Sequence, residues 1–293
     1  MKSEKPYCQL IGAGRAGRAL SIAMTQTGYQ FTWIGSNKIE DSIKLARQAG
    51  IKKYGVRFEG FNQNAGFLIL AVPDDKIKNV ASDAARAGII GNETTVAHLS
   101  GVLGSDELID VRKAGAKVMA FHPAQTLTLD SDPNTVFKNI FFDMEGDDDA
   151  CALGESVAKD LGARAIRLDP QSRVLSHLAM TVASNYSVSL IRMAEEIMIS
   201  AGIPLEAAQK MISPLFLNTA RNISTIGTVK SLTGPISRGD TEIIKTHLAA
   251  LERMNKEYKM LYSGLARIAL HIAVERGGIS EENAEEIIEL IGE

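Results

Sequence analysis

Residues 7–34, which read YCQLIGAGRAGRALSIAMTQTGYQFTWI, decide the fold. Residues 7–11 are a short apolar run and predict a strand, and residues 18–27 predict a helix. The glycine turn 12–17 lies between them, and a second apolar run, 31–34, follows the helix. Strand, glycine turn, helix and strand in this order form the first unit of a dinucleotide-binding fold.

The spacing of the three glycines predicts where a cofactor binds. Gly12 allows the tight turn, Gly14 lets the backbone approach a pyrophosphate, and Gly17 lets the helix pack close to the strand. The phosphates then lie on the unpaired N–H groups of the helix N-terminus. We therefore expect the turn residues to bind the cofactor: Gly12, Gly14, Arg15, Ala16 and Gly17.

The end of the second strand indicates which cofactor. An NAD site usually carries an acidic residue there, which binds the ribose 2′-hydroxyl, but no acid stands at positions 36–38. Ser36 and Asn37 can donate hydrogen bonds to a 2′-phosphate, and Lys38 and Arg15 supply positive charge. The alternative is an ordinary polar turn with a solvated lysine. We predict NADP rather than NAD.

Composition excludes several classes of function. The chain of 293 residues is 45% hydrophobic and 23% charged, and its net charge of −3 suggests neither a nucleic-acid nor an anionic-membrane partner. No signal-peptide pattern and no run of about eighteen apolar residues is found, so we expect a cytoplasmic protein without a membrane partner. Cys8 and Cys151 lack metal-ligand spacing, and we expect no metal.

Strand and helix patterns alternate up to residue 168. Further strands are expected at 66–72, 94–99, 117–121, 139–143 and 163–168, with a weaker one at 56–58. Helices are expected at 43–50, at 74–87 with Asp74 or Asp75 as the cap, at 106–113 and at 149–161. This alternation predicts an α/β fold with a doubly wound parallel Rossmann sheet. We assign residues 1–169 to a dinucleotide-binding domain.

From residue 170 onward only helical patterns occur, so residues 170–293 are assigned to an all-helical substrate and dimerisation domain. We expect a buried helix at 172–201, a helix at 205–222 bent near Pro214, one long helix from Asp240 to about Arg276, and a short one after Ser280. The long helix carries a continuous apolar stripe that needs a partner surface. We therefore expect a homodimer formed through this domain.

Several motifs in the chain resemble one bacterial family. They are Gly12–Gly17, AVPD at 71–74, HLSG at 98–101, FHPAQT at 121–126, His177 with ASN at 183–185, Pro214 with Leu215, and LTGPISRGD at 232–240. Together they resemble NADP-dependent oxidoreductases in which a Rossmann-like domain is fused to a helical domain of unknown function. That family is similar to pyrroline-5-carboxylate reductase, to deazaflavin-dependent NADP reductases, and to 6-phosphogluconate and β-hydroxyacid dehydrogenases.

The resemblance spans nearly the whole chain. It implies the fold, the cofactor, a C-terminal domain like that of 6-phosphogluconate dehydrogenase, and cofactor contacts at Val72 and Pro73. The Lys–Asn pair typical of β-hydroxyacid dehydrogenases is absent, because His177 and Thr181 stand where it might be sought. Lysine-based acid catalysis is therefore not implied.

Two candidate catalytic residues lie at the carboxyl ends of predicted strands, where ligands bind in open parallel sheets. Ser100 could donate a hydrogen bond to the nicotinamide or to a substrate oxygen. His122 could act as a general acid or base, or the His122–Pro123 pair could only restrict the backbone. We expect His98, inside a buried strand, to be structural.

A second candidate set lies along one face of the helix from 172, at His177, Thr181, Ser184 and Asn185. Buried polar groups need a partner, water or a ligand. His177 could exchange a proton and Asn185 could orient a carbonyl or imine, with Thr181 contacting the substrate in the cleft between the domains. The alternative is a satisfied polar network that joins the domains.

The third candidate is Arg238, beside the predicted N-terminus of the helix from Asp240. Both features attract anions, so a substrate carboxylate could bind there. Alternatively, Asp240 caps the helix and Arg238 is solvated or paired with it.

The sequence thus predicts an oxidoreductase that moves hydride between NADP and a small, anionic carbonyl or imine compound. His177 or His122 would exchange the proton, and Arg238 would anchor the substrate. The alternative is an NADP-binding sensor or regulatory protein without turnover, since one fold hosts many functions. A third possibility is reduction of a deazaflavin coenzyme.

Overall fold

The computed structural model describes residues 5–61 and 65–292. Contacts divide the chain into two compact units, residues 1–185 and 186–293, and each unit is described by itself. The predicted domain boundary lies at the start of helix α6 (Pro170–Ala183), whereas the contacts place that helix in the first unit.

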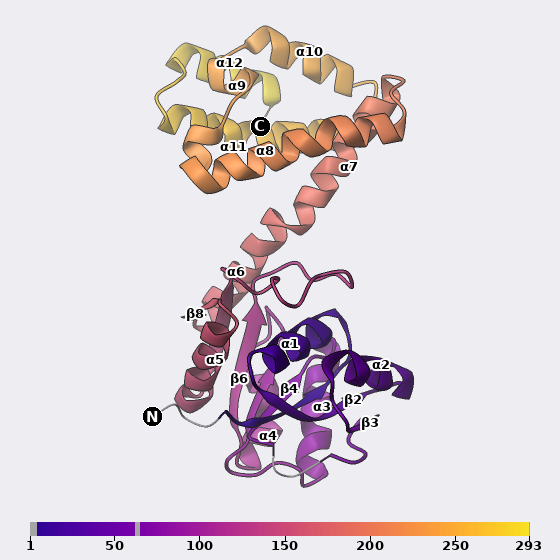
Figure 1. The fold of residues 1–293 in the computed structure, drawn as a ribbon. Helices are drawn as coiled ribbons and strands as arrows, with labels where there is room; N and C mark the ends of the chain where they lie inside the picture. The colour runs from indigo at the N-terminus through magenta and orange to yellow at the C-terminus, as the bar shows by residue number, and fades with distance from the viewer. Residues whose placement is uncertain (1–4, 62–64, 293) are drawn as a thin grey trace. The chain divides into compact units, whose positions relative to one another are not determined.

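The first unit is built on one sheet whose strands follow the order β3-β2-β1-β4-β5-β6-β7-β8 (Figure 1). The strands are β1 (Tyr7–Ile11), β2 (Gln30–Ser36), β3 (Tyr54–Val56), β4 (Phe67–Leu70), β5 (Thr95–His98), β6 (Lys117–Pro123), β7 (Phe141–Gly146) and β8 (Arg164–Arg167). The helices are α1 (Arg15–Gln26), α2 (Ile39–Ala49), α3 (Asp74–Arg86), the short 3-10 helix η1 (Ser105–Leu108), α4 (Ile109–Lys113), α5 (Asp148–Asp160) and α6.

The sheet is mostly parallel, as predicted, with one exception. Strand β7 pairs antiparallel with β6 and parallel with β8, so the last two strands run against the other six. The predicted fold class is confirmed, but the expectation of an all-parallel sheet is wrong at this junction. The strand order reverses between β1 and β4, and the carboxyl ends of these two strands open the crevice where ligands bind in such sheets.

Helices cover both faces of the sheet and create two hydrophobic cores. Residues of α1, α2 and α5 pack on one face, and residues of α3 and α4 pack on the other. Successive residues of the fully buried β4 point to opposite faces of the sheet. Phe67 and Ile69 pack in the first core, and Leu68 and Leu70 pack in the second. This burial on both faces explains the uninterrupted apolar run in the sequence.

The predicted helix at 172–201 is two helices, α6 and α7 (Asn185–Ser200), because the backbone turns at Ser184. Asp169 caps α6 by accepting hydrogen bonds from the N–H groups of Gln171 and Ser172. The expected burial is also wrong, since the buried residues of the two helices are Arg173 and Glu195.

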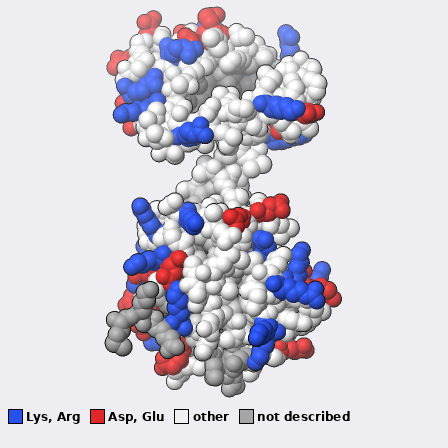
Figure 2. Space-filling model, in the orientation of Figure 1, with Lys and Arg blue, Asp and Glu red and all other residues white. Residues whose placement is uncertain are grey.

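Within the helical stretch Pro170–Ser200, an 18-residue window has a mean hydropathy of 1.2, which meets the length and composition test for a membrane span. No Lys, Arg, Asp or Glu lies between Arg173 and Arg192, and Figure 2 shows uncharged surface there. Apolar helices of soluble proteins pass the same test, so it is weak evidence for a membrane.

The second unit is helical, as predicted. It contains α7 beyond its first residue, α8 (Leu205–Ser231), α9 (Pro235–Arg238), α10 (Thr241–Leu251), α11 (Lys256–Glu275) and α12 (Glu281–Ile291). Its core is formed by apolar residues of α9 to α12: Ile236, Ile244, Leu248, Ala266, Leu270, Ile287 and Ile291.

Two helix predictions in the second unit need correction. Helix α8 runs well past residue 222 and is broken at Gly227, whose backbone is not helical. The single long helix predicted from Asp240 is divided into α10 and α11, because Asn255 caps α11 by accepting a hydrogen bond from the N–H of Glu257.

Candidate functional site

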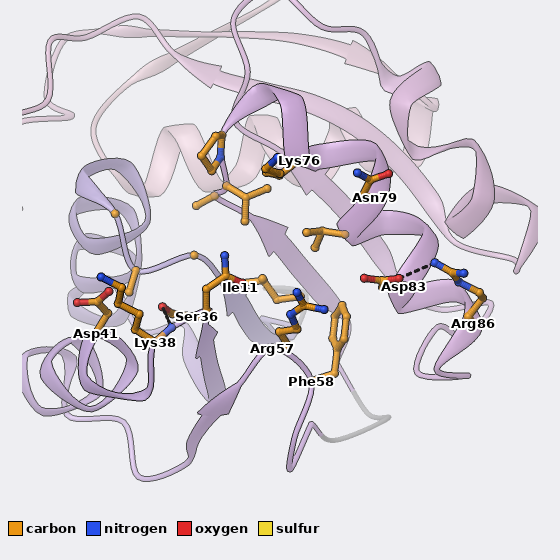
Figure 3. Close-up of a pocket in the computed structure, with 18 residues that line it drawn as sticks. Ile11, Ser36, Lys38, Asp41, Arg57, Phe58, Lys76, Asn79, Asp83 and Arg86 are labelled. Atoms are coloured by element: carbon orange, nitrogen blue, oxygen red, sulfur yellow. Dashed lines mark hydrogen bonds and ion pairs between the residues drawn. The ribbon is translucent and has the colours of Figure 1, made fainter.

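A first cavity of about 670 Å³ lies beside the glycine turn (Figure 3). The end of β1, the end of β2, the residues after β3 and one side of α3 from Lys76 to Arg86 line it. This is the crevice at the carboxyl ends of β1 and β4, where the sheet order reverses.

The glycines of the turn have distinct physical roles. A Cβ atom on Gly12, whose φ is +109°, would lie 2.1 Å from the carbonyl oxygen of Ala71, and one on Gly17 would lie 2.1 Å from that of Gly12. Both positions therefore need glycine for close packing. Gly14 differs, because no atom lies within 4 Å of its hypothetical Cβ, so its backbone faces open space at the N-terminus of α1. An anion can approach the N–H groups there.

Asn37, Lys38 and Ser36 all line the first cavity, where the NADP prediction needs them, and Ser36 also holds the turn. Its side chain is buried, and its Oγ accepts a hydrogen bond of 3.2 Å from the N–H of Lys38. Ser36 therefore shapes the turn that presents Asn37 and Lys38.

Arg57 is a cavity residue that the sequence reasoning missed. Ser36 pairs with Val56 in the β2–β3 ladder, and the N–H of Arg57 donates to the carbonyl of Ser36 over 3.0 Å. Arg57 therefore leaves β3 beside the same turn as Lys38, and Figure 3 shows both side chains at the cavity with Phe58 next to Arg57. Arg57 lay inside the weak strand predicted at 56–58, whereas β3 ends at Val56, so the misplaced strand hid its position at the turn.

The first cavity carries an excess of positive charge. Four of its lining residues are basic, Lys38, Arg57, Lys76 and Arg86, while two are acidic, Asp41 and Asp83. Asp83 is paired with Arg86 over 2.6 Å, and Lys76 is paired with Asp75 over 2.8 Å, which leaves Lys38 and Arg57 with Asp41. Such a lining favours an anionic ligand.

A second cavity, of about 780 Å³, adjoins the first. Gly14, Ala71, Val72 and Pro73 line both cavities, so the two meet at the glycine turn. The second cavity is also lined by predicted residues from distant parts of the sequence: Arg15, Ala16, His122, His177, Thr181, Ser184 and Asn185.

The two histidines of this cavity are neighbours. The ring centroids of His122 and His177 are 5.8 Å apart, with an angle of 60° between the ring planes. Nδ1 of His122 lies 2.8 Å from a carboxylate oxygen of Asp143, a residue that the sequence reasoning did not select. Close by, the hydroxyls of Thr126 and Ser184 share a hydrogen bond of 2.7 Å. Two imidazoles beside amide and hydroxyl groups can exchange protons with a polar ligand.

Comparison with known families divides the chain between residues 123 and 140, earlier than its contacts do. Residues 2–123 match the Rossmann-like domain family, and residues 140–269 match the domain of unknown function DUF2520. The chain combines a Rossmann-like domain with a DUF2520 domain. His122 lies in the Rossmann-like match, whereas Asp143 and His177 lie in the DUF2520 match, so both matched segments contribute to the second cavity.

Solved structures share the fold. A Bacteroides fragilis protein described as a "putative NADP oxidoreductase" has a TM-score of 0.74 at 23% identity, covering 91% of this chain and 98% of that one. A Thermotoga maritima protein has a TM-score of 0.72 at 22% identity, covering 92% and 98%. An imine reductase from a Pseudomonas species has a TM-score of 0.61 at 16% identity, covering 99% and 100%. No curated protein matches the chain.

In the Rossmann-like domain, the surroundings of Ser100 give it a structural role. Its hydroxyl donates to Asp74 over 2.8 Å and accepts from the N–H groups of Val102 and Leu103. Its side chain is buried, and neither cavity includes it. Asp74 thus holds Ser100 and does not cap α3, whose N-cap is Pro73.

His98 is fully buried, and its Nε2 lies 3.0 Å from the carbonyl oxygen of Gly104. Desolvation by burial lowers the pKa of His98 from its usual value of 6.5, so the fold favours the neutral ring. This agrees with its predicted structural role.

Arg238, the predicted substrate anchor, belongs to the second unit. Its guanidinium pairs with Asp240 at 2.6 Å, and its side chain is 58% exposed. An Arg238–Asp240 pair was the alternative to substrate binding in the sequence analysis. The role of Arg238 as an anchor for a substrate carboxylate stays a prediction. Within residues 5–61 and 65–292, no cluster of three or more His, Cys, Asp or Glu side chains is arranged to hold a metal ion.

Proposed function

We propose that this protein is an NADP-dependent oxidoreductase that transfers hydride to or from a small, anionic carbonyl or imine compound. The observation that carries the proposal is the pair of cavities that meet at the glycine turn. One has the cations that a 2′-phosphate needs, and the other has two histidines that can exchange a proton.

The residues present fit a dinucleotide. Gly14 leaves open space at the N-terminus of α1 for the pyrophosphate, and Lys38 and Arg57 are placed for the 2′-phosphate. When bound, a nicotinamide supplies or accepts the hydride, which no side chain can do. Val72 and Pro73 would guide the dinucleotide from the first cavity to the second, because they line both.

The second cavity offers the groups for the substrate. His122 or His177 would exchange the proton, while Asn185 and Thr181 would hydrogen-bond the carbonyl or imine group. The names of similar folds, an NADP oxidoreductase and an imine reductase among them, support this reaction class.

The first experiment is calorimetric titration of the purified protein with NADPH and, separately, with NADH. We expect NADPH to bind more tightly, because only NADPH carries the 2′-phosphate. A screen of carbonyl and imine compounds, each with and without a carboxylate, then follows oxidation of NADPH by its absorbance. If neither dinucleotide binds, the proposal is wrong.

The alternative, an NADP-binding sensor without turnover, predicts NADPH binding but no oxidation in a single-turnover experiment with any substrate. For the substrate anchor, Arg238→Ala should raise KM for a carboxylated substrate and leave NADPH affinity unchanged. An unchanged KM would remove Arg238 from the site.

We also propose that the protein is a cytoplasmic homodimer formed through the helical unit. Helix α8 spans 27 residues, and only Ala208 and Ile212 are buried among them in the described chain. Met211, Leu215 and Ile226 lie on one face of this helix and are 55%, 69% and 50% exposed, and an exposed apolar face of this kind marks a contact site.

Sedimentation velocity over a dilution series tests the dimer. We expect Leu215→Lys to shift the protein toward the monomer, while Gln209→Lys, an exposed polar position on another face of the helix, leaves it a dimer. A wild-type protein that stays monomeric at all concentrations would contradict the proposal.

A further inference from the structure

His122 and Asp143 are held opposite each other by the sheet itself. They form a directly facing pair in the antiparallel ladder of β6 and β7, so their side chains project from the same face. Nδ1 of His122 lies 2.8 Å from Oδ2 of Asp143, whose side chain is 2% exposed. The reversal of strand direction at β7 therefore places a buried carboxylate directly behind the imidazole.

Arg173 holds the carboxylate from the other side. One of its terminal nitrogens donates to Oδ1 of Asp143, and the other donates to the carbonyl oxygen of Ser100 over 2.6 Å. The side chain of Arg173 is fully buried. A buried charge is tolerated only with a partner, so the Arg173 guanidinium pairs with the Asp143 carboxylate and fixes its orientation.

The ring of His177 is a neighbour of the same imidazole, with 5.8 Å between the ring centroids. Arg173 and His177 are four residues apart on α6 and lie on one face of it. The backbone of Gly101 packs against both histidines, since a Cβ there would lie 2.4 Å from Cδ2 of His177 and 3.0 Å from Nε2 of His122. The Cε1–Nε2 edge of His122 thus faces Gly101, and both rings line the second cavity.

We propose that Asp143 and Arg173 are positioning residues that hold His122 in its Nδ1–H tautomer, so that Nε2 is the atom that exchanges the proton in the second cavity. A neutral imidazole carries one proton, and the hydrogen bond at one nitrogen sets which nitrogen holds it. An ionised carboxylate only accepts, so the nitrogen facing Asp143 must carry the hydrogen.

The role of Nε2 in the reaction rests on the proposed function. In the reducing direction, protonated His122 gives its Nε2 proton to the oxygen or nitrogen of the substrate group and becomes the neutral Nδ1–H imidazole. In the oxidising direction, the lone pair of Nε2 takes that proton back. In both directions the Asp143 carboxylate accepts the Nδ1–H hydrogen bond of His122 and stays paired with Arg173.

The test is the tautomer of His122, read from long-range proton–nitrogen correlation spectra of protein labelled with ¹⁵N-histidine. The chain has five histidines, so the His122 signals are identified by their loss in His122→Gln. At a pH where the ring is neutral, we expect the Nδ1–H form to dominate in the wild type. A dominant Nε2–H form would overturn the inference, and this result needs no further variant.

Asp143→Asn should abolish the preference for the Nδ1–H tautomer, because an amide side chain can donate as well as accept a hydrogen bond. Glu145→Gln is the matched control. Glu145 lies on the same strand and bonds Ser105 instead of a histidine, so the His122 tautomer should not change. A preserved Nδ1–H form in folded Asp143→Asn would also overturn the inference.

NADPH titration of the same samples separates this inference from the proposed function. If NADPH binds but His122 is in the Nε2–H form, the positioning role is refuted and the proposed cofactor stands. The Nδ1–H tautomer without NADPH binding refutes the proposed cofactor and leaves the positioning role in place.

Discussion

Replacing Arg57 by alanine should weaken NADPH binding about tenfold and leave NADH binding unchanged. A hydrogen bond between charged groups contributes about 1.5–3 kcal/mol when it is sheltered from water. Arg57 is exposed, so solvent screening reduces this to about 1.4 kcal/mol, which corresponds to a factor of about ten in Kd. NADH lacks the 2′-phosphate and so loses nothing.

Calorimetry with each dinucleotide measures this selectivity directly. Lys38→Ala should have a similar effect, and the double variant should lose less than the sum, because both cations would contact one phosphate. Lys44→Ala is the control, since Lys44 is exposed on α2, changes the net charge equally and lines neither cavity. Raising the salt concentration should narrow the difference between wild type and Arg57→Ala. If Arg57→Ala weakened NADPH and NADH binding equally, the 2′-phosphate assignment would be wrong.

Three further predictions test other parts of the site. Gly14→Asp should fold normally, because space is open around its Cβ, yet lose NADPH binding through repulsion of the pyrophosphate; unchanged affinity in calorimetry would contradict the cofactor site. Gly101→Ala should lower the free energy of unfolding by about 1–3 kcal/mol, because its methyl group displaces the His177 ring, and should change the NMR shifts of His122 and His177. Unaltered histidine shifts would show that the rings are not packed as described. His98 should make the fold less stable as the pH falls below 6.5, because the unfolded chain then binds a proton that the buried ring refuses; the slope is at most about 1.4 kcal/mol per pH unit. Denaturant titrations at several pH values between neutral and acidic give the free energy of unfolding of wild type and His98→Gln. This free energy should change less with pH in the variant, and an equal change would exclude this role for His98.

Much of the Rossmann-like domain could be predicted because its signals are local. The apolar run of β4 is continuous since both faces are buried, and Gly50 ends α2 in the left-handed conformation that favours glycine. The direction of β7 was missed because hydrophobic pattern carries no information about strand direction. The missing helix pattern in residues 124–140 was the useful signal, because a connection between two parallel strands usually contains a helix.

The helix breaks were missed because apolar periodicity continues across them. At Asn255 the cap could have been found, since asparagine followed by a glutamate in the first turn is a helix-start signal. At Ser184 no comparable signal exists in the sequence.

The candidate site was predicted in part. One cavity is lined by His122, His177, Thr181 and Asn185. These residues could be selected because the spacing of the sequence predicts the strand ends and the helix face on which they lie. Asp143 could not be selected, since its role depends on which residue it faces across the β6–β7 ladder. That pairing is set by three-dimensional register, which the sequence does not display.

The antiparallel ladder of β6 and β7 tolerates changes in the length of its connection but not insertions within its strands. Residues 124–127, at the start of the connection between the strands, line the second cavity, so changes in the length of 128–133 would remodel access to it without disturbing the ladder. One residue inserted in β7 before Asp143 would instead turn that side chain to the opposite face of the sheet. A designer who wishes to change the substrate should therefore work in the connection and leave the strands intact.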